Sequence, residues 1–231
     1  MAIEAVIFDW GGTLTPWHSI NVEQLWGTVC EPHFPVGQAG VHAAALHAAE
    51  QELWRAGEAE RRSATMSQVF GTAGVPVTDE LIASYQRAWE PHTFTDPDVP
   101  PLLAYLRERG IKVGVLSNTM WPRDWHEHVF RRDGVLHLID GSVYSSEIDW
   151  VKPHPEAFLA AMAAVGVTDP RRCVFVGDRP YDDVHGAQAV GMRAVLVPNS
   201  DVPPFGAAVP DAVIERLREL VPLVDGWHAA G

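Results

Sequence analysis

The chain has little of what would direct it to nucleic acid, to a membrane or to a disulfide scaffold. Its 231 residues include 17 lysines and arginines against 30 acidic residues, a formal net charge of −13. Because the basic residues are not clustered, we expect neither a nucleic-acid partner nor a membrane partner. No apolar run approaches the length that spans a bilayer. Two cysteines, Cys30 and Cys173, are too few for a disulfide framework at this size.

Lysine is especially scarce, since Lys112 and Lys152 are the only two in the chain. Lys112 stands at the start of an apolar run and is explained by that position, whereas Lys152 is not. The hydrophobic content of 47% and the charged content of 20% are ordinary for a globular protein. The short approach from Met1 to the first apolar run leaves no room for a signal peptide, so we expect a cytoplasmic location.

The residues near the start of the chain carry the strongest signal. The apolar run Val6, Ile7, Phe8 is typical of a buried strand in a parallel sheet. It ends at Asp9, and the glycines at 11 and 12 then break the strand and let backbone approach a ligand. Ligands of open parallel sheets bind at the carboxyl ends of the strands. Asp9 is therefore a candidate nucleophile and metal ligand.

The rest of the chain divides into a helical part and an alternating part. Between residues 16 and 95 the patterns predict helices only, at 20–29, 39–56, 63–73 and 78–89. After residue 96 the patterns alternate, with strands at 111–117, 138–144, 172–178 and 193–197 and helices at 102–109, 123–132, 155–165, 182–190 and 212–221. This alternation predicts an α/β fold with a doubly wound parallel sheet. We expect a core of residues 1–15 and 96–231 and a small all-helical cap of residues 16–95.

Polar residues follow several of the predicted strands. Ser117 and Asn118 end the second strand, and Asp178 follows a later one. Lys152 precedes a predicted helix and can place a cation at the same rim. Since parallel strands present their carboxyl ends together, these side chains are expected to converge with Asp9.

In four places the chain resembles the haloacid dehalogenase (HAD) superfamily of hydrolases. The first motif of that family is a strand followed by Asp-x-Asp-Gly-Thr-Leu, the second a strand followed by Ser-Asn, the third a lysine before Pro-x-Pro, and the fourth Gly-Asp followed by a further aspartate. The corresponding segments here are Asp9-Trp-Gly-Gly-Thr-Leu14, Val115-Leu-Ser-Asn118, Ser145-Ser-Glu with Lys152-Pro-His-Pro155, and Val176-Gly-Asp-Arg-Pro-Tyr-Asp-Asp-Val184. The resemblance covers essentially the whole chain, and the segment near 16–95 is similar to the family's helical cap.

The resemblance implies a Rossmann-like core and a Mg²⁺-dependent phosphatase acting on a small phosphorylated metabolite. Asp9 would form an aspartyl-phosphate that water then hydrolyses. The implied roles are catalytic for Asp9, Ser117 and Lys152, substrate-binding for Gly11, Asn118 and Lys152, and metal-binding for Asp9, the Gly11 carbonyl, Asp178 and Asp183. Asp182, one residue before Asp183, is a rival for the outer place in the metal site.

One position departs from the family pattern. Phosphatases of the family carry a second aspartate two residues after the nucleophile, and this chain has Gly11 there. General acid–base help of that kind contributes about 10²–10⁴-fold in rate. Three outcomes stay open: His18 or a cap carboxylate supplies the proton, the leaving group needs little help, or catalysis has been lost.

The same departure raises three rival functions. Phosphonoacetaldehyde hydrolases also lack the aspartate, but they need a cap lysine for a Schiff base, and the cap here has none. A 2-haloacid dehalogenase would need no metal, which leaves the acidic pair at 182 and 183 without a use. A catalytically weak, phosphate-binding or regulatory relative is the third. The sequence predicts neither the identity of the substrate nor the oligomeric state.

Overall fold

A six-stranded parallel sheet forms the centre of the computed structural model, which describes residues 2–202, 205–206 and 208–229. The strands run in the order β3-β2-β1-β4-β5-β6, and every neighbouring pair is parallel. Their bounds are β1 (Ala5–Phe8), β2 (Lys112–Ser117), β3 (Gly141–Tyr144), β4 (Cys173–Gly177), β5 (Arg193–Leu196) and β6 (Ala212–Val213). The predicted α/β sheet is confirmed, and β1 lies between β2 and β4.

Both faces of the sheet are covered, so the central strands are apolar throughout. Val6 and Phe8 of β1 point into a cluster with α5 and α9 on one face. Ala5 and Ile7 point the other way, into a cluster with α7 and α8. The helices of this part are α5 (Val99–Glu108), α6 (Arg123–Arg132), α7 (Pro155–Val165), α8 (Gly186–Ala189) and α9 (Leu220–Ala229).

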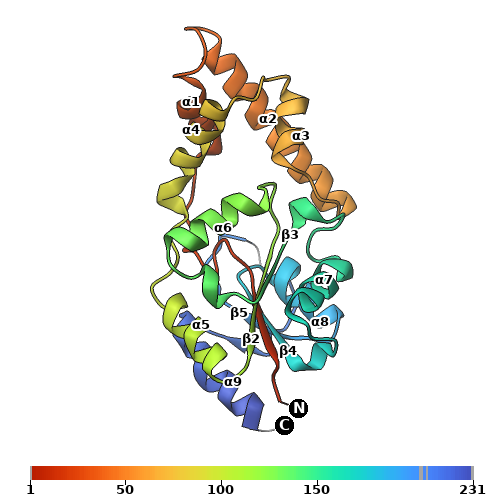
Figure 1. Cartoon of the computed structure of the whole chain (residues 1–231). Coiled ribbons are helices and arrows are strands. Elements are labelled where there is room, and N and C mark those ends of the chain that lie inside the picture. Colours follow the sequence, from red (N-terminus) through yellow and green to blue (C-terminus); the bar gives the residue numbers. More distant parts are fainter. Residues whose placement is uncertain (1, 203–204, 207, 230–231) are drawn as a thin grey trace.

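The helical segment lies beyond one end of the sheet (Figure 1). It consists of α1 (Val22–Cys30), α2 (Ala39–Glu60), α3 (Met66–Ala73) and α4 (Asp79–Trp89). Local chemistry sets the helix starts: Thr78 caps α4, and Thr65 forms a capping box with Gln68 at α3. The helices enclose an apolar cluster that includes Trp26 and Tyr85, and Met120 and Trp121 from the segment after β2 complete it. The division at residues 16 and 95 into a separate cap stays a prediction.

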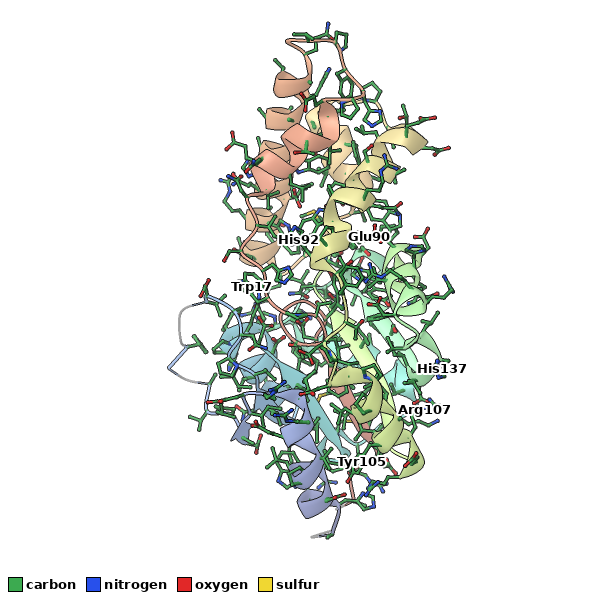
Figure 2. All side chains as sticks on the ribbon, turned by 90° about the vertical axis from the view of Figure 1, so that its left-hand side faces the viewer. Trp17, Glu90, His92, Tyr105, Arg107 and His137 are labelled. Atoms are coloured by element: carbon green, nitrogen blue, oxygen red, sulfur yellow. The ribbon has the colours of Figure 1, made fainter. Side chains whose placement is uncertain are left out.

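Two linkers join these helices to the sheet. Figure 2 shows Trp17 on the first linker and His92 on the second at the waist between the two parts. The linkers are in contact, since His18 Nδ1 lies 3.0 Å from His92 Nδ1. Within the described part of the chain, every helix is too short or too polar to cross a lipid bilayer.

The last predicted helix, at 212–221, is wrong. Residues 212–213 form β6, because Asp211 hydrogen-bonds to the Ala194 backbone through both its own N–H and its carboxylate, each at 2.8 Å. The helix α9 begins only at Leu220, where Leu220 and Val224 are buried on one face. The predicted strand 138–144 is shorter, starting at Gly141. The predicted helix 182–190 is confirmed as helical: a wide turn of π-helix at Pro180–His185 continues directly into the short α8.

Candidate active site

The carboxyl ends of the three central strands form the candidate site. Asp9 follows β1, Ser117 ends β2, and Asp178 follows β4, so strand order alone places them side by side. Oxygen atoms of Asp9, Asp178 and Asp183 all lie within 4.8 Å of one another, and the three residues are buried. The structure therefore brings together Asp183 rather than its rival Asp182, whose carboxylate faces the Arg179 guanidinium at 3.5 Å.

Two glycines allow the carboxylates to come this close. Gly12 has φ of +87°, and a Cβ there would lie 2.5 Å from Asp178 Oδ2. A Cβ on Gly177 would lie 2.3 Å from the Asp183 carboxyl carbon. Both distances are shorter than atoms tolerate, so only glycine fits. Neither residue was singled out from the sequence in this role, although both lie inside the quoted motifs.

Lys152 supplies the central positive charge of the site. Its Nζ donates to Asp9 Oδ1 at 2.6 Å and to Asp183 Oδ1 at 2.7 Å, and the side chain is buried. Burial by itself would lower the pKa of Lys152, but Asp183 and Asp9 outweigh it and raise the pKa. Burial raises the pKa of Asp9, and the Lys152 charge opposes that rise.

Asp178 is the member of the cluster that lacks a protein partner. Both of its carboxylate oxygens are buried without a hydrogen bond among the described residues. Burial, followed by the charges of Asp9 and Asp183, raises the pKa of Asp178 to about 8. A buried carboxylate left unpaired is costly, and oxygen ligands of this kind suit a hard divalent cation such as Mg²⁺. The donor set therefore fits the metal that the sequence predicts.

Asn118 is used differently from the substrate-binding role expected for it. Its amide nitrogen donates to the Lys152 carbonyl at 3.0 Å, and its amide oxygen accepts from the Lys152 N–H at 2.8 Å. Both ends of the side chain thus hold the backbone that carries the lysine. Ser117, next to it at the end of β2, is 3% exposed. Its hydroxyl makes no hydrogen bond within the described residues, so it is free for a phosphate oxygen.

Arg179 is a charged residue of the site that sequence reasoning missed. Its backbone N–H donates to Asp183 Oδ2 at 2.9 Å. Burial would lower the pKa of Arg179, but nearby carboxylates, with Asp178 first, raise it. Burial also raises the pKa of Asp182 to about 6. When all these groups are ionised, the positive charges of Lys152 and Arg179 face four carboxylates, those of Asp9, Asp178, Asp182 and Asp183. The site then has two negative charges in excess.

The structure leaves room for a side chain at position 11, where phosphatases of the family carry the second aspartate. Among the described residues, no heavy atom beyond the chain neighbours lies within 4 Å of a Cβ built on Gly11, and the Gly11 backbone is not in the left-handed region. His18, one candidate for the missing acid, is paired with His92 at the linkers.

Trp10, the residue after Asp9, packs against the rings of Trp121 and His126, with 5.4 and 4.5 Å between ring centroids. These contacts give Trp10 a packing role.

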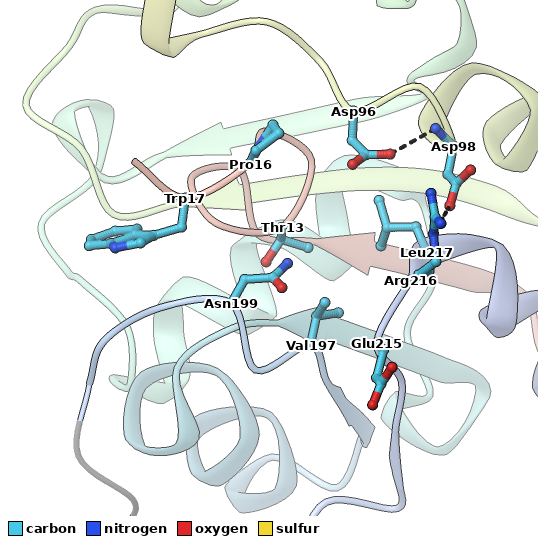
Figure 3. Close-up of a pocket in the computed structure, with 10 residues that line it drawn as sticks. All are labelled: Thr13, Pro16, Trp17, Asp96, Asp98, Val197, Asn199, Glu215, Arg216 and Leu217. Atoms are coloured by element: carbon cyan, nitrogen blue, oxygen red, sulfur yellow. Dashed lines mark hydrogen bonds and ion pairs between the residues drawn. The ribbon is translucent and has the colours of Figure 1, made fainter. Parts of the chain in front are cut away.

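A cavity of about 260 Å³ is lined in part by the loop after β1 (Figure 3). Thr13 and Asn199 line it together with Trp17 of the first linker, and Asp9, Asp178, Asp183 and Lys152 do not. The Asn199 amide donates to the Gly12 carbonyl at 3.0 Å, and this hydrogen bond holds the loop after β1. The cavity is therefore separate from the acidic cluster, although the loop after β1 borders both.

Comparison with known proteins identifies the family. Residues 3–191 match the model of the haloacid dehalogenase-like hydrolase family. A glyceraldehyde 3-phosphate phosphatase of Methanopyrus kandleri is 37% identical over 132 residues, which cover 55% of each chain. The chain spans about half the length of the curated relatives it matches first.

Solved structures agree on the fold. A HAD phosphatase from Thermococcus onnurineus and a 2-haloacid dehalogenase from Pseudomonas syringae each match with a TM-score of 0.67, 23% identity and coverage of 97% of this chain and 99% of theirs. At this identity the likeness speaks for the fold alone, and it is the same for both activities. The family match over most of the length, together with the acidic cluster and its lysine, assigns the chain to the haloacid dehalogenase-like hydrolases.

Proposed function

We propose that the protein is a Mg²⁺-dependent phosphatase that hydrolyses a small phosphorylated metabolite through an aspartyl-phosphate at Asp9. The observation that carries the proposal is the pairing of Asp9 with Lys152 at 2.6 Å beside Asp178, whose two buried oxygens have no partner in the described chain. The names of the relatives support it, since they include a glyceraldehyde 3-phosphate phosphatase and a phosphoserine phosphatase. The cytoplasm remains the expected location.

Each residue has a distinct part in this reaction. Asp9, Asp178 and the Gly11 carbonyl would hold Mg²⁺, with Asp183 at its outer side, because Lys152 and Arg179 already occupy the Asp183 oxygens. The ion would neutralise charge on the phosphoryl group. Lys152 keeps Asp9 ionised as the nucleophile and offsets the negative charge of the substrate. Ser117 would donate its hydroxyl to a phosphate oxygen.

The glycine at position 11 narrows the substrates that fit. Because position 11 has no carboxyl group to protonate the leaving oxygen, departure depends on the acidity of the leaving group. The leaving groups of acyl phosphates and activated aryl phosphates depart without a proton, whereas those of sugar and alkyl phosphates need one. We therefore infer that the preferred substrate has a leaving group of low pKa.

The proposal is tested by metal binding and turnover together. Calorimetric titration should show one Mg²⁺ bound by the wild type and most of the affinity lost in Asp178→Asn. From a panel of aryl, acyl and alkyl phosphates, the acyl and activated aryl phosphates should be hydrolysed fastest, and only with Mg²⁺. Acid quenching should trap the phosphoryl group on Asp9. Unchanged Mg²⁺ binding in Asp178→Asn, or a phosphoryl group trapped on another residue, would overturn the assignment.

A 2-haloacid dehalogenase is the second candidate, because the aspartate that phosphatases of the family carry is absent at position 11. The unpaired Asp178 counts against it, because a metal-free reaction gives that buried carboxylate no use. Halide release from a 2-haloacid without Mg²⁺ would establish it. A non-catalytic relative would instead bind phosphate with Mg²⁺ and turn over none of the panel.

A further inference from the structure

The loop that leads into Lys152 is paired with a segment from the helical part of the chain. Arg62, in the connection between α2 and α3, forms an antiparallel bridge with Trp150. Two backbone hydrogen bonds flank the bridge, from the Ser63 N–H to the Asp149 carbonyl at 3.2 Å and from the Val151 N–H to the Arg61 carbonyl at 3.3 Å. Residues 61–63, which we call the docking segment, thus add a short strand to the edge of residues 149–151.

Side chains strengthen this pairing on its outer face. The Arg62 guanidinium lies 4.0 Å from the centre of the Trp150 ring. That ring stacks in turn on His154, with 3.8 Å between centroids and 7° between planes. His154 caps α7 by accepting from the Glu156 N–H at 3.3 Å. A cation placed over one face of a tryptophan ring, with a second ring stacked on that tryptophan, makes a directional contact. It therefore ties the docking segment to the whole turn 150–154.

The same turn is held from inside by Asn118, which takes both the N–H and the carbonyl of Lys152. The docking segment is equally well fixed on its own side. The Arg62 N–H donates to the Gly57 carbonyl at 3.2 Å, and a Cβ on Gly57 would lie 2.8 Å from the Arg62 carbonyl. The segment consequently moves with α2, and any movement of α2 is passed directly to the turn that carries Lys152.

Arg61 adds a second connection to the site. It is the one non-glycine among the described residues with positive φ, at +54°. Its guanidinium donates to the Tyr181 hydroxyl at 3.0 Å, within the wide turn 180–185 that also contains Asp183. A non-glycine residue holds this conformation only where its surroundings compensate for the strain. Of the two carboxylates that accept from the Lys152 ammonium, Asp9 follows β1 and Asp183 lies in this wide turn. The docking segment therefore contacts both the turn that carries Lys152 and the turn that carries Asp183.

We propose that Arg62 and Trp150 are positioning residues, which couple docking of the segment 61–63 to the placement of the Lys152 ammonium against Asp9. The inference rests on the proposed function, since the placement of Lys152 matters for phosphoryl transfer. When the docking segment separates from 149–151, the turn loses its outer support and Lys152 shifts from Asp9. Reacting groups that move by about 1 Å lose up to roughly 100-fold in rate. The phosphoryl group thus meets a correctly placed lysine only while the helical part is docked.

The test compares Arg62→Ala and Trp150→Ala with variants that keep the contact. We expect each alanine variant to lower kcat by about tenfold or more, with an unchanged melting temperature. Arg62→Lys and Trp150→Phe, which retain a cation over an aromatic ring, should recover most of the loss. The double alanine variant should be no slower than either single one, because both remove the same contact. Arg55→Ala is the matched control, since Arg55 on α2 carries the same charge and bonds only within its own helix, to the Gln51 carbonyl at 3.3 Å.

Hydrogen exchange supplies a readout that is independent of catalysis. The amides of Ser63, Val151 and Lys152 should be protected in the wild type and should exchange faster in Arg62→Ala but not in Arg55→Ala. If the wild type cleaves no phosphate ester, the proposed function fails while this measurement still decides the coupling. Unchanged protection of Val151 and Lys152, additive losses of kcat in the double variant, or rates equal to those of Arg55→Ala would overturn the inference.

Discussion

Lys152 holds its charge in the interior, between two carboxylates and away from water. Lys152→Ala leaves Asp9 and Asp183 buried without their cation, so we expect a loss of about 3–5 kcal/mol in unfolding free energy without Mg²⁺. Phosphate binding and kcat should fall together. Lys152→Arg should recover only part of both, because a planar fork does not replace a point charge. Urea unfolding and steady-state rates measure these effects, and equal activity in wild type and Lys152→Ala would refute the role.

Gly11 is the position at which restoring the family residue is informative. The space around it is open and its backbone is unstrained, so Gly11→Asp should fold normally. We expect rates on alkyl phosphates to rise by about 10²–10⁴-fold and the dependence of rate on leaving-group pKa to flatten. Rates across a series of aryl and alkyl esters measure this. If the wild type already hydrolyses alkyl phosphates as fast as the variant, another residue is the acid.

His126 is a histidine of the protein interior. It is fully buried, stacks on Tyr144 at 4.4 Å between centroids and pairs through Nε2 with Thr119 Oγ1 at 3.1 Å. Burial lowers the pKa of His126 from 6.5 to about 3. Between these values the unfolded chain binds a proton that the folded chain does not. Stability conferred by the neutral ring is therefore complete above pH 6.5 and decreases as the pH falls towards 3.

The prediction is a slope in stability against pH. From pH 6.5 downwards, His126 should cost up to about 1.4 kcal/mol of unfolding free energy for each pH unit. In His126→Gln, which does not titrate and retains polar atoms for Thr119, this part of the slope should disappear. Urea unfolding between pH 4 and 7 compares the two proteins. Parallel curves would show that His126 does not titrate as its burial indicates.

At the scale of the element, the strand ends depend on glycines that no side chain can replace. Gly12→Ala would place a Cβ 2.5 Å from Asp178 Oδ2 at a φ of +87°, so we expect loss of most Mg²⁺ affinity and turnover. Gly37→Ala is the matched control, because Gly37 has φ of +89° but nothing within 4 Å. Each should lose about 1–2 kcal/mol from the left-handed backbone, but only Gly12→Ala should lose the metal. Equal Mg²⁺ binding by the two variants would contradict the steric argument.

Elements whose signals are local agree best with the sequence. The predicted helices at 123–132 and 155–165 have the observed bounds, and α7 ends at Gly166 in the left-handed conformation, as a glycine cap predicts. The last predicted helix failed because hydrogen bonds from Asp211 to Ala194 recruit residues 212–213 into the sheet. Those partners are far apart in the sequence, and local periodicity does not register them.

At the scale of the whole molecule, the apolar cluster of α1–α4 also takes in Met120 and Trp121 from the segment after β2, and Trp10 packs against both this cluster and the one beside the sheet. Leu46 is fully buried in the cluster of α1–α4, and Leu103 is fully buried against the sheet. Leu46→Ala and Leu103→Ala should each cost about 2–5 kcal/mol locally. If residues 16–95 form a separate cap, Leu46→Ala should weaken hydrogen-exchange protection in α1–α4 alone. Equal loss of protection in β1 and β4 would show one cooperative unit instead.

The sequence by itself determined the parallel sheet and the family, because strand runs, glycine breaks and motif spacing are local properties of the chain. It also named Asp9, Asp178 and Lys152, since parallel strands must present their ends together. Only the tertiary structure decided which of Asp182 and Asp183 joins the cluster and how Asn118 is used. Only it paired Arg62 with Trp150, 88 positions further along. Such choices depend on side-chain direction and on contacts between distant segments, and these arise only when the chain has packed.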